Sequence, residues 1–111
     1  LQTQGSEHGR ATLAAMKDRL FARGEPSPKA LQGALAAICD TDLRGEIGGI
    51  GQPALVVSGA RDTLALPEAG RWLAEHLPAA RFALIPGAGH APFLSHGDAF
   101  AAALDPFLDA R

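Results

Sequence analysis

Two short apolar runs that each end in a turn constrain the fold of this chain more than any other feature. Residues 54–57 are ALVV and residues 82–85 are FALI, and Pro67 opens a stretch between them whose apolar residues have helical spacing. A second helical pattern follows the second run. This order of strand, helix, strand and helix places two parallel strands side by side through a right-handed crossover. The sequence therefore predicts an α/β fold.

The pattern also predicts how the last helix begins and how it ends. Ser95 and Asp98 have the spacing of a capping box, in which each side chain bonds the backbone of the other residue. Pro106 lies inside the helical pattern and is expected to kink or shorten the helix, because proline lacks the backbone N–H.

The first part of the chain has helical periodicity only. Apolar residues share one face of a helix between residues 10 and 23, which Gly24 closes. Ser27 is expected to cap a second helix that has Pro28 at its first position. A short loop joins the two helices, so we expect them to pack as an antiparallel pair.

The composition fits one domain and argues against several classes of function. The chain has 111 residues, of which 47% are hydrophobic, enough for a core. A formal net charge of −2 without a run of Lys or Arg gives no indication of nucleic-acid binding. The apolar runs are too short to span a membrane. A start at Leu1 instead of methionine indicates a piece of a longer protein.

The single cysteine bears on the compartment. Cys39 cannot form an internal disulfide, and it lies in an apolar helical stretch where we expect it to be buried as a small hydrophobic residue. One unpaired cysteine is typical of a reducing compartment, which predicts a cytoplasmic protein.

One glycine pattern could be mistaken for a cofactor site. Gly49, Gly51 and Ala54 match G-x-G-x-x-A, but the match contains Pro53 and precedes a strand. A dinucleotide-binding loop follows a strand and opens a helix. No cofactor is therefore predicted.

Two residues with catalytic potential follow the two predicted strands. Asp62 comes just after the first strand and His90 just after the second. The carboxyl ends of parallel strands meet at one edge, where ligands bind, so we expect the two side chains to be within hydrogen-bond distance. An acid followed by a histidine is the end of a Ser…Asp…His triad. Taken singly, an aspartate or a histidine at such a position is more typical of an ordinary turn or a solvated loop. The placement of both at one edge favours a catalytic role.

A metal site is disfavoured at the same edge. Asp62, His90 and His96 could in principle supply three ligands, but no pair of them has the spacing typical of zinc ligands. No metal is therefore predicted.

The stretches PALVVSGARD and GAGHAP, which contain these two residues, resemble the C-terminal part of the α/β-hydrolase fold. GHAPFLSH, TDLR and the opening LQTQGSEHGR are similar to the family of esterases that act on pimeloyl-[acyl-carrier protein] methyl ester in biotin synthesis. The resemblance implies that Asp62 is the triad acid and His90 the base. It also implies that residues 1–40 are the second half of a helical lid and residues 41–111 the C-terminal strand–helix–strand–helix part of the core.

The chain departs from the family pattern in one important respect. It has no G-x-S-x-G motif and no oxyanion loop. We therefore expect the serine nucleophile to lie outside this chain, in the remaining N-terminal part of the same enzyme. The 111 residues alone are expected to be inactive.

The resemblance implies a serine carboxylesterase whose partner is an acyl-carrier protein bearing the ester. Between residues 8 and 30 five basic residues outnumber two acidic ones, and such an excess would steer an acidic carrier. Arg10, which matches a lid arginine of the resembled family, and Lys17 are the candidate carrier-binding residues. The alternative is that these charges form the solvated face of a helix.

Two other functions remain open from the sequence. One is another lidded α/β-hydrolase, such as a lactonase, a C–C hydrolase or a haloperoxidase-like enzyme. The other is a catalytically dead module of the same fold that binds a ligand. A serine in a G-x-S-x-G motif would exclude the dead module.

Overall fold

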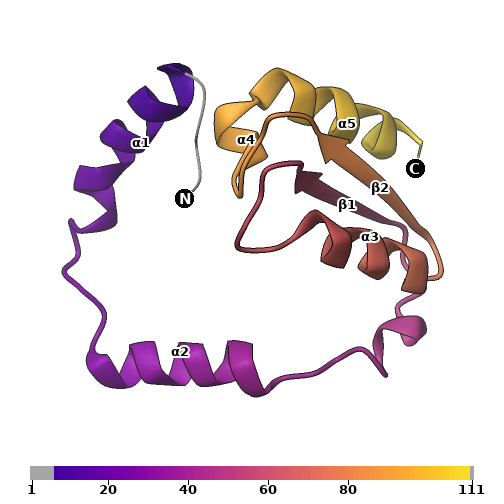
Figure 1. The fold of residues 1–111 in the computed structure, drawn as a ribbon, viewed down its shortest axis with the longest axis horizontal. Coiled ribbons are helices and arrows are strands. Elements are labelled where there is room, and N and C mark those ends of the chain that lie inside the picture. Colours follow the sequence, from indigo (N-terminus) through magenta and orange to yellow (C-terminus); the bar gives the residue numbers. More distant parts are fainter. Residues whose placement is uncertain (1–6, 111) are drawn as a thin grey trace.

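Two parallel strands form the centre of the structure, a computed structural model that describes residues 7–110. Strand β1 (Ala54–Gly59) pairs with β2 (Ala80–Ile85) in register from the first residue of each strand to the last. Helix α3 (Pro67–His76) makes the crossover between them (Figure 1). The predicted α/β fold and its parallel strand pair are confirmed.

Helices pack on the strand pair to make the layers. Helix α3 contacts both strands, and so does α5 (Gly97–Asp109), which covers the other face (Figure 1). The one-turn helix α4 (Pro92–Ser95) leads from the end of β2 toward α5. The most buried apolar residues gather just beyond the carboxyl end of β2 and at its last residue: Ile85, Ala88 and Ala91.

The predicted capping box at the start of α5 is wrong. Ser95 is the last residue of α4, and its hydroxyl donates to the carbonyl of Ala91 over 3.3 Å. His96 is the N-cap of α5, and no side chain in the described part of the chain caps that helix. The reason is that Pro92 starts a separate turn, which ends at Ser95 before α5 begins.

Pro106 does not shorten α5, which was one of the two effects expected of this proline. Helix α5 continues beyond Pro106 to Asp109. Proline removes one N–H bond, but only one more turn of helix follows it, and Phe107 in that turn is half-buried.

The two helices of the first part do not form the predicted antiparallel pair. Helix α1 (Glu7–Leu20) and α2 (Pro28–Asp40) lie along different sides of an open ring of elements and meet only at their connecting segment (Figure 1). Gly24 in that segment has a φ of 84°, in the left-handed region. An apolar stripe indicates which face of a helix is suited to burial, but it does not identify the element against which that face packs.

As a result the apolar side chains of α2 are exposed within the described residues. Leu35 is 61% exposed and Ile38 is 79% exposed. Cys39 is exposed as well, so its predicted burial is wrong. The N-terminal prediction for α2 is confirmed, because Ser27 is its N-cap and Pro28 its first residue. No helix within residues 7–110 is both long enough and apolar enough to cross a membrane.

The cap of α2 generates a prediction about its local stability. The Ser27 hydroxyl oxygen accepts a hydrogen bond from the backbone N–H of Ala30, with an N–O distance of 3.2 Å. This bond satisfies a donor that has no partner inside the helix. We expect Ser27→Ala to destabilise the first turn of α2 by about 1 kcal/mol, and Ser27→Asp to preserve it. Amide hydrogen exchange at Ala30 measures the difference. Equal protection in the two variants would contradict the prediction.

Candidate active site

The candidate site lies at the carboxyl ends of the two strands. A tight turn follows β1 and leads to Asp62, whose N–H bonds the carbonyl of Gly59 at 3.1 Å. A second turn follows β2 and leads to His90. Gly87 in that turn has a φ of 74°, a backbone conformation that favours glycine. The parallel pairing thus brings the two turns to one edge of the sheet (Figure 1).

The structure brings together the two residues that the sequence analysis singled out. Nδ1 of His90 lies 2.9 Å from Oδ2 of Asp62, although the residues are 28 positions apart in the chain. The expected hydrogen-bond distance is confirmed. The catalytic roles of the two residues stay a prediction.

Backbone amides orient the Asp62 carboxylate. Its Oδ1 accepts the N–H of Leu64 at 2.9 Å and the N–H of Ala65 at 3.0 Å. Because Oδ1 is held in this way, Oδ2 is turned toward His90. Neither of these two donors was predicted, although the sequence carries a signal for them, since an aspartate at a strand end often accepts a hydrogen bond from the backbone two residues further on.

The two members of the pair differ in their exposure. The Asp62 side chain is 6% exposed and the His90 side chain is 40% exposed. The acid is therefore shielded from water, while the imidazole is accessible to a reactant. With Nδ1 engaged by Asp62, Nε2 is the ring nitrogen that can exchange a proton with that reactant.

The surroundings of Asp62 keep it ionised at neutral pH. Burial acts to raise the pKa of this carboxyl, but the hydrogen bonds from the Ala65 amide, the His90 ring and the Leu64 amide outweigh it, so its pKa lies below the usual 3.8. An ionised carboxylate only accepts hydrogen bonds. His90 therefore donates through Nδ1–H, which fixes its tautomer.

His96 is not part of this pair. Its Nδ1 lies 2.8 Å from the hydroxyl of Ser95, next to it in the chain. No group of three or more His, Cys, Asp or Glu side chains within residues 7–110 is placed to hold a metal ion.

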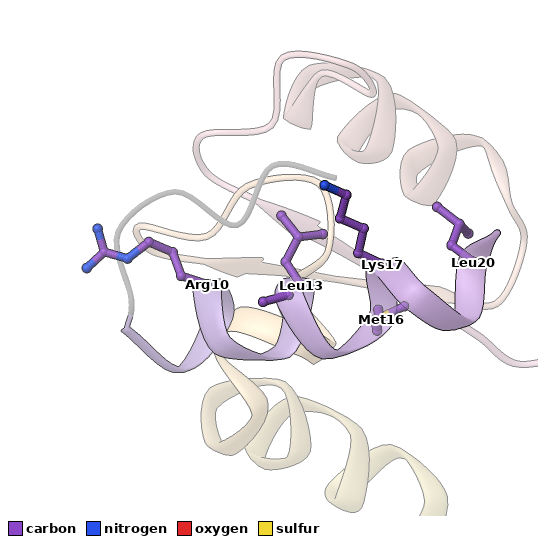
Figure 2. Close-up of a pocket in the computed structure, with 6 residues that line it drawn as sticks. Arg10, Leu13, Met16, Lys17 and Leu20 are labelled. Atoms are coloured by element: carbon purple, nitrogen blue, oxygen red, sulfur yellow. The ribbon is translucent and has the colours of Figure 1, made fainter. Parts of the chain in front are cut away.

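Arg10 and Lys17, the candidate carrier-binding residues, lie on α1 instead of at the sheet edge. Both are exposed, and they line a hollow on α1 together with apolar side chains (Figure 2). The apolar residues of that hollow are Leu13, Ala14, Met16 and Leu20. The structure thus places two cations at the border of an apolar surface on α1, a helix that contacts α4.

Comparison with known proteins identifies the family. Residues 3–103 match the group described as "Alpha/beta hydrolase family". A protein of Xanthomonas oryzae named "Pimeloyl-[acyl-carrier protein] methyl ester esterase" is 44% identical over 97% of this chain and 43% of its own length. A protein of the same name from Stenotrophomonas maltophilia is 42% identical over 99% of this chain and 42% of its own length. The chain thus spans less than half the length of these relatives.

Solved structures show the same fold. A bromoperoxidase from Bacillus anthracis has a TM-score of 0.69 and 31% identity, over 75% of this chain and 30% of the bromoperoxidase. An enol-lactonase from Burkholderia xenovorans LB400 has a TM-score of 0.63 and 27% identity, over 97% of this chain and 47% of the lactonase. These similarities confirm that the chain has the fold of the C-terminal part of such enzymes.

The lowered pKa of Asp62 predicts how stability depends on pH. A carboxyl whose pKa is lower in the folded than in the unfolded chain stabilises the fold above its usual pKa of 3.8, and this contribution is lost as the pH falls toward the folded pKa. Asparagine does not titrate. We therefore expect the difference in unfolding free energy between the native protein and Asp62→Asn to shrink as the pH falls below about 4.

Urea unfolding of both proteins at a series of pH values measures this difference. A difference that stays constant down to about pH 2 would contradict the prediction, because the carboxyl would then titrate alike in both states.

Proposed function

This chain belongs to the alpha/beta hydrolase family, and on that basis we propose that it is the C-terminal part of a serine carboxylesterase. In this proposal Asp62 is the triad acid and His90 the general base. The observation that carries it is the hydrogen bond of 2.9 Å between the two side chains at the carboxyl edge of the sheet. The nucleophilic serine and the oxyanion site would come from residues outside this chain, since it contains no G-x-S-x-G motif.

The proposed reaction uses His90 twice. Nε2 accepts the proton of the serine hydroxyl as the serine oxygen attacks the ester carbonyl, and it then gives this proton to the departing alkoxide, which leaves as an alcohol. Water next attacks the acyl-enzyme with the same base, and the serine regains its proton as the acid product leaves. The Asp62 carboxylate stabilises the imidazolium that forms in each half-reaction.

We further propose that the substrate is the methyl ester of a pimeloyl chain on an acyl-carrier protein. The support is the shared name of the relatives that match nearly the whole chain. The products would be methanol and the carrier-bound acid. This reaction would belong to biotin synthesis.

The layers of the structure support a proposed domain organisation. Residues 41–111 contain the strands and the helices that pack on them, and they would form the C-terminal part of the catalytic core. Residues 1–40 would be the second half of a lid, because α1 and α2 lie outside those layers (Figure 1). The cations of α1 would then meet the carrier at the entrance of the site.

A lactone is the second candidate substrate. The structural neighbour from Burkholderia xenovorans is named an enol-lactonase, and a lactone is a cyclic ester that the same acid and base could open. Comparing turnover of a carrier-bound methyl ester with that of an enol-lactone separates the two candidates. A dead binding module would turn over neither.

The triad assignment predicts large losses in the full-length protein. We expect Asp62→Asn to lower kcat about 10⁴-fold, as the same change does in a serine protease, because it stabilises the wrong tautomer of His90. His90→Ala should cost at least as much, and the double variant little more, since members of a triad act as a unit. The measurement is ester hydrolysis, with circular dichroism as a check of folding.

The isolated chain of 111 residues tests whether the nucleophile lies outside it. We expect this chain to hydrolyse no ester above the buffer rate. Activity of this chain alone, or a full-length protein that is indifferent to His90→Ala, would overturn the mechanism.

The carrier proposal predicts an effect that depends on substrate and salt. Replacing Arg10 and Lys17 by glutamate should lower kcat/KM for the carrier-bound ester about tenfold at low salt, because the attraction to an acidic carrier is lost. The loss should fade at high salt, where the native attraction is screened. Turnover of a small soluble ester should change little.

Arg81→Glu is the control. Arg81 is an exposed cation of β2 that lies outside the basic stretch of residues 8–30 and does not line the hollow of α1. Equal losses in the control, or equal losses for both substrates, would remove the carrier from the proposal.

A further inference from the structure

The last residue of β1 is pressed against the turn that carries His90. Gly59 is buried, and the carbonyl groups of Ala88 and Gly89 lie directly over it. A Cβ atom at Gly59 would fall 2.5 Å from the Ala88 oxygen and nearer still to the Gly89 oxygen. Such contacts are essentially never closer than 3.0 Å, and backbone oxygens cannot rotate away as a side chain can. Only glycine fits here without a shift of the backbone.

Backbone hydrogen bonds join the same two turns. The N–H of Ala60 donates to the carbonyl of Ile85 at 3.0 Å, and the N–H of Arg61 donates to the carbonyl of Ala88 at 2.8 Å. These bonds extend the pairing of β1 and β2 past the ends of the strands. They connect the residue before Asp62 to a residue two positions before His90.

We propose that Gly59 is a positioning residue for His90. Its missing side chain lets the backbone of the His90 turn approach the backbone of the Asp62 turn until the two side chains reach hydrogen-bond distance. The distance within the pair is thus set by contact between main chains. That this matters for ester hydrolysis rests on the function proposed above.

The test is Gly59→Ala in the full-length protein. The added methyl group must push the His90 turn away by roughly 1 Å, a displacement that can cost about 10²-fold in rate when it affects a catalytic group. We expect kcat to fall about a hundredfold with little change in KM. We also expect the far-downfield proton NMR signal of the His90 Nδ1–H, which reports its bond to a carboxylate, to be lost.

Gly70→Ala is the matched control, because it also crowds β1 but from the side of α3. Its Cβ would meet the hydroxyl of Ser58 and the ring of Phe82, which are side chains, and none of its three nearest atoms belongs to the backbone of the His90 turn. It should lower stability while keeping the downfield signal and kcat. Gly97→Ala, whose Cβ meets nothing within 4 Å, should change neither.

A second pair of variants tests the same coupling if Gly59→Ala does not fold. Arg61→Pro removes the N–H that bonds Ala88, whereas Arg61→Ala keeps it and removes only an exposed side chain. We expect the downfield signal and kcat to decrease in Arg61→Pro but not in Arg61→Ala.

The two readouts separate the outcomes. An unchanged signal in a folded Gly59→Ala, an equal loss in Gly70→Ala, or equal behaviour of the two Arg61 variants would overturn the positioning role. A third outcome is that the native protein hydrolyses no ester but still loses the downfield signal in Gly59→Ala. That outcome would support the positioning role of Gly59 and refute the proposed function.

Discussion

The in-register pairing of β1 with β2 is the interaction on which the rest of the structure depends. It places Gly59 opposite Ile85, so the turns that follow the two strands begin at the same level. Two residues 28 positions apart then come within 2.9 Å. A shift of one residue in this register would send each side chain to the other face of the sheet and separate the pair.

Burial follows the same geometry. The most buried residues of the described chain lie at the carboxyl end of the sheet, around the turn that carries His90, whereas α2 is exposed along its length. A carboxylate is costly to bury, and Asp62 is tolerated there because two amides and an imidazole bond it. The most buried part of the molecule is thus the part that holds the candidate site, where packed neighbours can hold catalytic groups in place.

Much of the fold and the central pair of the candidate site could be predicted from local signals. Pro28 and Pro67 mark helix starts, and apolar runs mark the strands, because these signals depend on neighbours along the chain. Two of the predictions that failed needed knowledge of distant partners. The exposure of Cys39 and the separation of α1 from α2 depend on what packs where, which periodicity does not encode. The prediction for Ser95 failed for a local reason, because Pro92 starts a separate turn that ends at Ser95.

The sequence by itself determined the order of the elements and, through the right-handed crossover, that Asp62 and His90 share one edge. Tertiary structure alone decided how closely the two turns approach. That approach depends on the carbonyls that lie over Gly59 and on the hydrogen bond from the Arg61 amide to the Ala88 carbonyl. Backbone groups are the same in every residue, so a sequence does not reveal where they will point until the chain has folded around them.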